Sequence, residues 1–168
     1  MVTDAIKTPR RDGGDRGKTV HRISPSVLIV AWPGALSQSL GTFLMVVHRV
    51  STIILTCDAA AAVEAVEQRC PSLAIVETGM GDGMGIEALQ CIRAIAPHTP
   101  ILALAQDRAQ IEQAEALGAD VVLMEGVRPD VLRATIHTLL HDTATGKDGA
   151  TCLLGHRLSK LTFSKVES

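Results

Sequence analysis

Aromatic side chains are nearly absent from this chain of 168 residues. They make up only 2% of the sequence, with one Trp, two Phe and no Tyr. Proteins that bind single-stranded nucleic acid stack the bases on aromatic rings, so a stacking platform of that kind is excluded. The hydrophobic content is still 46%, which predicts a core built from Val, Ile, Leu and Ala.

Clustered metal ligands are also missing. The four cysteines lie far apart without a C-x-x-C pair, which excludes a zinc knuckle or a thioredoxin-type motif. Of the six histidines, His137 and His141 are four residues apart near the end of a predicted helix, where histidine often serves as a cap. We therefore expect no metal and no cofactor, and this cysteine usage fits a reducing cytoplasm.

Charge of one sign and long apolar runs are lacking as well. The formal net charge is −2, so bulk charge favours neither nucleic acid nor a membrane surface. The longest apolar stretch, residues 44–55, is interrupted by His48 and Arg49, so no membrane span is expected. The sequence also contains no G-x-G-x-x-G, Walker or G-x-S-x-G motif. We expect no catalytic residues, no enzyme activity and no small-molecule substrate.

Three regions differ in their pattern. Residues 1–25 mix Lys, Arg, Asp, Gly and Pro without apolar periodicity, which is typical of a disordered basic tail. Residues 26–141 alternate apolar strand-like runs with helical stripes, and residues 142–168 lose this pattern and are expected to form a linker and tail.

Five strand–helix units are predicted in the middle region. The strands are expected at 27–31, 52–56, 73–77, 100–104 and 121–124, and the helices near 36–47, 59–68, 86–93, 109–117 and 129–140. Runs that are apolar on both faces indicate a parallel sheet covered on each side. Right-handed crossovers then predict an α/β fold, a doubly wound five-stranded parallel sheet of order 2-1-3-4-5.

A lone acid, Glu77, ends the third predicted strand and precedes the glycine-rich loop 78–85. In this strand order, the switch point lies between the first and third strands. Glu77 should therefore meet Ala31 and Trp32, which follow the first strand. Trp32 is expected either to cover the pocket as an apolar lid or to be a partly exposed loop residue.

Three segments carry a family resemblance: LAIVETGMGDGMGIEALQCIRAIAP, TPILALAQ and ALGADVVLMEGVRPDVLRATIHTLL. Over roughly residues 26–141 the chain resembles a response-regulator receiver domain, the phosphoacceptor module of two-component signalling and phosphorelay. The resemblance implies the flavodoxin-like receiver fold.

The resemblance also assigns the family's functional positions, and none of the five expected side chains is present. The acidic pair that holds Mg²⁺ matches Ala31 and Trp32, and the phosphoacceptor Asp matches Glu77. The Thr/Ser and the Lys of the switch match Ala105 and Glu125. A degenerate site of this kind is expected neither to bind Mg²⁺ nor to accept phosphate. Glu77 is a poor mimic of phosphoaspartate, because the hydroxyl and ammonium that read the active state are missing.

We therefore expect a pseudo-receiver that acts by phosphorylation-independent protein–protein interaction. Its partner protein, or a second copy in a homodimer, would bind the face of the fourth helix, fifth strand and fifth helix; the alternative is that these are merely solvated helix faces. The candidate residues of that face are Gln110, Gln113, Glu115, Val122, Arg128, Asp130 and Arg133.

Two other functions remain open. The ending LSKLTFSKVES is similar to the opening of a LuxR-type output domain, which would make the chain the receiver half of a transcription regulator. Nucleic-acid binding is expected only if a missing output domain follows. Alternatively, the pocket around Glu77, Glu125 and Trp32 is re-purposed in a flavodoxin-like enzyme or ligand-binding domain.

Overall fold

The computed structural model describes residues 25–145, with side chains as far as residue 141. The predicted basic tail lies almost wholly outside the described residues, as does most of the predicted C-terminal linker. Several boundaries differ by one or two residues from the prediction, and the last helix differs most, because it continues to Thr145 rather than ending at Leu140.

The predicted sheet is confirmed, because five parallel strands pair in the order β2-β1-β3-β4-β5. The strands are β1 (Ser26–Val30), β2 (Thr52–Thr56), β3 (Leu73–Glu77), β4 (Ile101–Ala105) and β5 (Val121–Met124). The β1 and β3 strands are neighbours in register, with Val30 opposite Val76. Their carboxyl ends therefore meet at one edge of the sheet, the usual position of a site in such folds.

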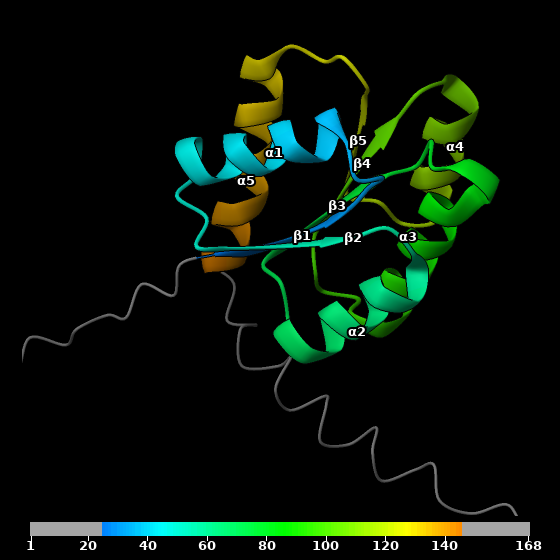
Figure 1. Ribbon diagram of the computed structural model, residues 1–168, viewed down its shortest axis with the longest axis horizontal. Helices are drawn as coiled ribbons and strands as arrows, with labels where there is room; N and C mark the ends of the chain where they lie inside the picture. Colours follow the sequence, from blue (N-terminus) through cyan, green and yellow to red (C-terminus); the bar gives the residue numbers. More distant parts are fainter. Residues whose placement is uncertain (1–24, 146–168) are drawn as a thin grey trace, which may run out of the picture.

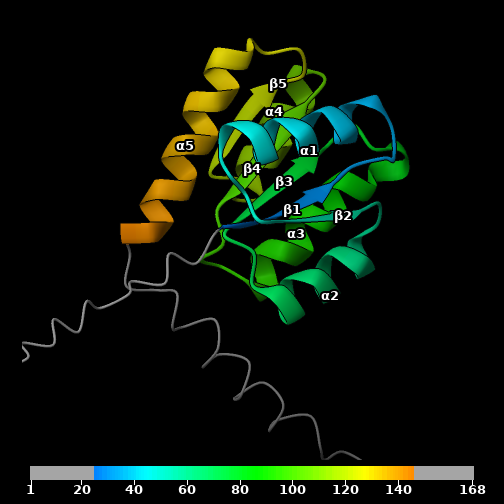
Figure 2. The ribbon, with the colours of Figure 1, turned by 60° about the vertical axis from the view of Figure 1, so that its left-hand side comes forward.

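Helices cover both faces of the sheet (Figures 1 and 2). They are α1 (Ala35–Val47), α2 (Ala59–Arg69), α3 (Met84–Ile95), α4 (Arg108–Ala116) and α5 (Pro129–Thr145), with a short 3₁₀ turn η1 (Gly81–Gly83) before α3. One core forms between the sheet and α1 and α5, where Leu40, Leu44 and Ile136 are buried. The other forms between the sheet and α2, α3 and α4. Both cores are aliphatic, as the composition predicts.

Side-chain caps set where two of the helices begin. The Asp58 carboxylate accepts a hydrogen bond from the Ala61 amide at 2.7 Å, and Asp107 does the same for Gln110 at 2.8 Å. Capping satisfies amides that have no partner within the helix. The Asp107 cap places α4 directly after the end of β4, beside the switch-point edge. Within the described part of the chain, no helix is long and apolar enough to cross a membrane.

Candidate functional site

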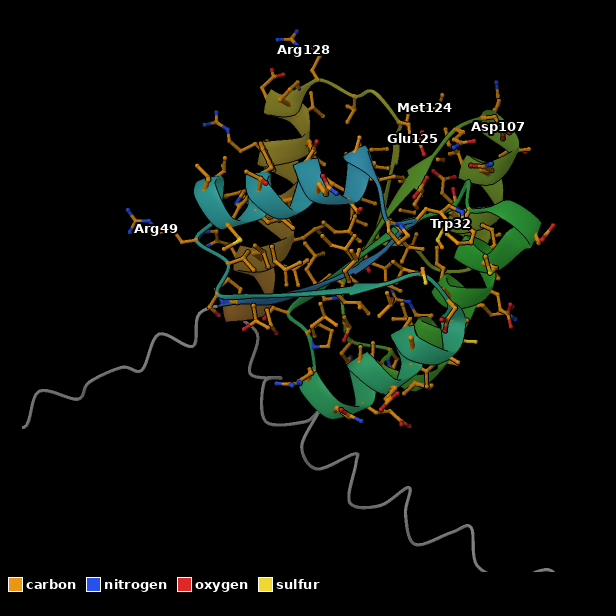
Figure 3. The ribbon with its side chains drawn as sticks, viewed as in Figure 1. Trp32, Arg49, Asp107, Met124, Glu125 and Arg128 are labelled. Atoms are coloured by element: carbon orange, nitrogen blue, oxygen red, sulfur yellow. The ribbon has the colours of Figure 1, made fainter. Side chains whose placement is uncertain are left out.

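The switch-point edge brings Glu77 and Trp32 together, as the strand order predicts. The Trp32 backbone N–H donates a hydrogen bond to Glu77 Oε2 at 3.3 Å. Ala31 is buried beneath this contact, with 1% of its surface exposed. The Trp32 ring is 46% exposed, so it is a partly exposed loop aromatic rather than a sealed lid (Figure 3).

The electrostatics of Glu77 disfavour its charged form. Partial burial raises the pKa of its carboxyl, and the nearby Glu125 carboxylate raises it further. The Trp32 amide acts in the opposite direction but does not reverse the shift. Desolvation and nearby negative charges both disfavour the ionised form of a carboxyl group, so both effects are expected at this edge.

The ends of β4 and β5 complete the site. Ala105 is fully buried and has no polar side-chain atom to offer. Its carbonyl oxygen accepts a hydrogen bond from the Glu125 backbone N–H at 2.8 Å, which places Glu125 at the switch-point edge. Figure 3 shows Glu125 and Met124 where β5 ends, near the edge that also carries Trp32.

Gln106 is a site residue that sequence reasoning missed. Its side chain amide donates to Glu125 Oε1 at 3.3 Å. It also lies directly over Gly79, because a Cβ added there would collide with the Gln106 amide group. The sequence signal that could have located Gln106 is its position immediately after the fourth strand, which ends at this edge of the sheet. Gln106 therefore places a neutral amide beside Glu125 and over the loop that follows Glu77.

A second polar network ties the end of β3 to α4. The buried Thr78 hydroxyl lies 3.0 Å from both the Leu104 carbonyl oxygen and Gln110 Oε1. Gln110 Oε1 also accepts the Gln106 backbone N–H at 2.9 Å. Gln110 was expected to be exposed on the interaction face, but it is half-buried because its amide is held by this network.

The other candidate residues of the face lie on α4, β5 and α5, except Arg128, which directly precedes α5. Gln113, Glu115, Arg128, Asp130 and Arg133 are exposed. Arg128 is paired with Asp130 through two contacts, at 3.1 and 3.0 Å. Val122 is half-buried and packs against the core under α2, α3 and α4.

The donor set does not fit Mg²⁺. This ion takes oxygen ligands in octahedral geometry, usually from one or two carboxylates with waters. Ala31 is an apolar buried side chain, Trp32 offers an indole, and only Glu77 supplies a carboxylate at the β1–β3 edge. Among the described residues, no group of three or more His, Cys, Asp or Glu side chains could hold a metal ion.

The family model of the response regulator receiver domain matches residues 27–137. Solved receiver domains share this fold. One from a DNA-binding response regulator of Colwellia psychrerythraea is 17% identical, with a TM-score of 0.62, covering 70% of this chain and 98% of its own. A CheY-like receiver domain from Methanospirillum hungatei is 20% identical, with a TM-score of 0.63 and coverages of 71% and 96%.

A third similar structure holds a metal. The receiver domain of a sensor histidine kinase from Pseudomonas aeruginosa has a magnesium ion coordinated in its active-site cleft; it is 17% identical, with a TM-score of 0.61 and coverages of 70% and 98%. The comparison with curated proteins found no match.

Fold and family match together define the class: this is a signalling module built on a doubly wound parallel sheet. The chain belongs to the response regulator receiver domain family.

Proposed function

We propose that this chain is a pseudo-receiver that works in signalling by protein–protein interaction without accepting phosphate. The observation that carries the proposal is the chemistry of the site itself. A buried Ala31, a half-exposed Trp32 and a lone Glu77 stand where the family resemblance places the Mg²⁺-binding and phosphoacceptor groups.

Charge is the physical reason. Transfer of a phosphoryl group to a carboxylate depends on neutralising the negative charge that both partners carry. Here Glu125 stands where the resemblance places a lysine, and it already raises the pKa of Glu77 by repulsion. An incoming phosphate would meet two carboxylates and no facing cation from the side chains that line this edge.

The exposed side chains of α4 and α5 support interaction as the remaining role. Receiver domains act through partner proteins, and a protein partner or a second copy would dock here on the face formed by α4, β5 and α5. Because Gln110 is held inward, the face would be read through Gln113 and Glu115 on α4, through Asp130 and Arg133 on α5, and through Arg128 directly before α5. The cytoplasm is the location that we infer for this role.

A charge-restored variant makes the test decisive. The wild type and the variant Ala31→Asp/Trp32→Asp/Glu77→Asp/Ala105→Thr/Glu125→Lys would each be incubated with acetyl phosphate and Mg²⁺. Intact-protein mass spectrometry should show no phosphate on the wild type. A phosphate on the restored variant would show that the conditions support the reaction.

The intrinsic fluorescence of Trp32 gives a second readout on the wild type alone. Because Trp32 is the only Trp and the chain has no Tyr, its emission reports the mouth of the site. Mg²⁺ with beryllofluoride should leave the emission unchanged. Phosphate incorporation into the wild type, or a saturable quench, would overturn the proposal.

A further inference from the structure

A cavity unrelated to the switch-point edge lies between the end of α1 and the middle of α5. It has a volume of about 320 Å³ and is lined by Val47, His48, Arg133, Ala134 and His137. At about 30 Å³ per water molecule, this is room for a small organic ion with some solvent. Both helices lie over the same face of the sheet (Figure 2).

Three of the five lining residues can carry positive charge, and none can carry negative charge. The α1 helix, ALSQSLGTFLMVV, contains no charged residue, and Arg49 follows His48 directly. On α5 the described charged or titratable side chains are Asp130, Arg133, His137 and His141. Asp130 is paired with Arg128, and within the described residues no ion pair involves Arg133.

His48 lines this cavity, and one nitrogen of its ring has no partner within the described structure. Its backbone N–H caps α1 on the Leu44 carbonyl oxygen at 3.1 Å, and its ring packs edge-on against Phe43, with centroids 5.7 Å apart. Within the described structure, His48 Nε2 is buried without a hydrogen-bond partner. Buried polar atoms are nearly always paired, so an unpaired one calls for an explanation.

The electrostatics of His48 agree with the geometry. Burial lowers the pKa of the imidazole, and the nearby His137 and Arg133 lower it further. All three effects disfavour a positive charge on His48, and no carboxylate is among the residues that line the cavity. An anion in the cavity would oppose them, because its negative charge would lie beside Arg133 and favour the protonated ring.

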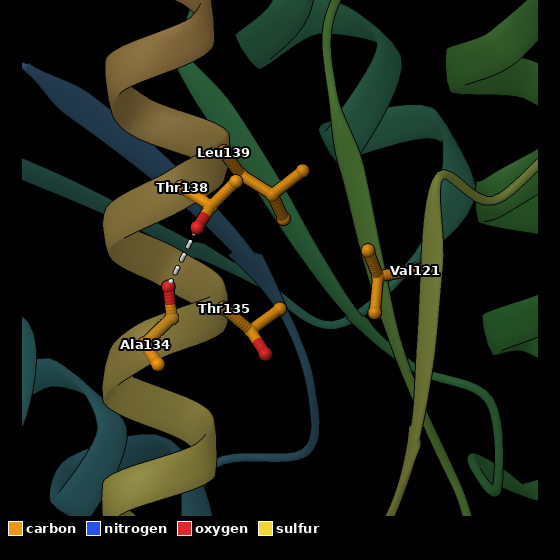
Figure 4. A pocket seen from close by; sticks show the side chains of 5 residues that line it. All are labelled: Val121, Ala134, Thr135, Thr138 and Leu139. Atoms are coloured by element: carbon orange, nitrogen blue, oxygen red, sulfur yellow. Dashed lines mark hydrogen bonds between the residues drawn. The ribbon is translucent and has the colours of Figure 1, made fainter.

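The neighbouring cavity on the other side of α5 provides a contrast (Figure 4). It has a volume of about 280 Å³ and is lined by Val121, Ala134, Thr135, Thr138 and Leu139, none of them charged. The Thr138 hydroxyl there already donates to the Ala134 carbonyl oxygen at 3.1 Å. The positive potential is thus confined to the α1 side of α5.

We propose that the cavity between α1 and α5 is a binding site for the phosphate or carboxylate group of a small ligand, held by Arg133, His48 and His137. Arg133 supplies a permanent charge and a planar pair of donors, which suits both groups. His137 supplies a further N–H donor, and the His48 ring forms part of the cavity wall. The site shares Arg133 with the interaction face proposed above, but anion binding here does not require that face to bind a partner.

Binding should be followed by NMR on the histidine ring Cε1–H signals of the whole chain. The probes are inorganic phosphate and glutarate, with chloride at matched ionic strength as the control anion. The His48 and His137 signals should shift saturably with an oxyanion but not with chloride. A shift with phosphate alone assigns a phosphate ligand, and a shift with glutarate alone assigns a carboxylate ligand. The pKa of His48, read from its pH titration, should rise when the binding anion is present.

Two matched variants distinguish specific binding in the cavity from a general effect of anions on a charged protein surface. Arg133→Gln should weaken binding about tenfold, since a hydrogen bond to a charged group contributes about 1.5 kcal/mol or more. Arg108→Gln removes the same charge from α4, outside the cavity, and should leave affinity unchanged. Equal shifts with chloride, no shift with either oxyanion, or equal affinity for wild type and Arg133→Gln would each overturn the assignment.

Discussion

At the scale of single residues, Glu77 couples the site to the stability of the fold. Its pKa is raised above the ordinary value of 4.5 by burial and by Glu125, so the folded state holds its proton more tightly than the unfolded chain. The contribution of Glu77 to the free energy of unfolding is therefore fully present at low pH. It is lost as pH rises from 4.5 through the raised pKa.

Glu77→Gln removes that titration while it keeps an oxygen for the Trp32 amide. We expect the melting temperature of the variant, relative to wild type, to increase as pH rises from about 4 to about 8, because only the wild type acquires the unfavourable charge. Thermal unfolding followed by circular dichroism at a series of pH values measures this. Glu67→Gln, on the exposed surface of α2, is the matched control for the loss of one charge. A difference that stays constant with pH would contradict the explanation.

Gly85 is the position where the start of α3 passes closest to the end of β3. A Cβ there would collide with the Glu77 carbonyl oxygen and would stand 2.9 Å from Thr78 Cα, so backbone would have to move. Gly85→Ala should lower the free energy of unfolding by about 2 kcal/mol or more, the typical cost of overpacking a rigid site. Urea unfolding of the variant gives this value.

Gly41 provides the control for Gly85. It lies inside α1, and a Cβ there would meet only Ile53 Cδ1, at 3.9 Å. Gly41→Ala should therefore stabilise the fold by about 0.5 to 1 kcal/mol through the loss of unfolded-chain freedom. Similar destabilisation by both substitutions would mean that the close approach at Gly85 is not the cause.

Side-chain partners across the site were the part that sequence could not predict. The positions of Glu77, Ala31 and Trp32 follow from the strand order, because it dictates which strand ends are neighbours. The contacts of Gln106 with Glu125, and of Gln110 with Thr78, depend instead on how the loops after the strands and the start of α4 are placed relative to one another. Spacing along the chain does not encode that arrangement, so the inward position of Gln110 was missed.

At the scale of elements, one ion pair joins α3 to the segment that leads into β5. Arg93 Nη2 donates to Asp120 Oδ2 at 2.6 Å, and the same oxygen accepts the Ile101 amide at 2.7 Å. Arg93 Nη1 also donates to the Pro97 carbonyl oxygen at 2.6 Å. Asp120, directly before β5, thereby links this strand to α3 and to the start of β4.

Asp120→Ala should lower the free energy of unfolding by about 1 to 2 kcal/mol, because it removes a charged acceptor from two donors. The expected loss is small for a charged acceptor because the Asp120 side chain is 44% exposed, and solvent screens its interactions. Asp120→Asn keeps an acceptor oxygen and should cost less. Urea unfolding of both variants tests this, and an equal loss would show that hydrogen bonding to the oxygen is not what stabilises the link.

Strands were easier to predict than helix ends. The strands are continuous apolar runs because they are buried on both faces, so their limits show in composition. The α5 helix passes its predicted end because Thr and Ala can continue a helix where no stop residue intervenes. The α3 helix begins at Met84, two residues before its apolar stripe, following the positive φ of 75° at Gly83.

At the scale of the whole molecule, the topology followed from pattern and handedness alone. Five apolar strands alternating with helices, joined by right-handed crossovers, leave few possible arrangements. The same reasoning located the edge at which Glu77 meets Trp32. It did not reveal the cationic cavity between α1 and α5, because His48, Arg133 and His137 come from helices far apart in sequence.

The interaction face makes a prediction about the molecule in solution. If α4, β5 and α5 form a homodimer interface, a charge reversal on α4 should disrupt association without affecting the fold. Glu115→Arg should weaken self-association at least about tenfold, since charge complementarity is lost across the interface. Glu67→Arg makes the same charge change on α2, which covers the other end of the sheet, and should have no effect.

Light scattering over a range of concentrations, with and without acetyl phosphate and Mg²⁺, measures both self-association and its dependence on phosphorylation. A phosphorylation-independent dimer should have the same mass in the two conditions, because a ligand that does not bind cannot shift an equilibrium. A monomeric wild type at all concentrations would rule out the homodimer and leave a different protein as the partner. Association that appears only with acetyl phosphate would instead show that the site still accepts a phosphoryl group, despite its missing acids and lysine.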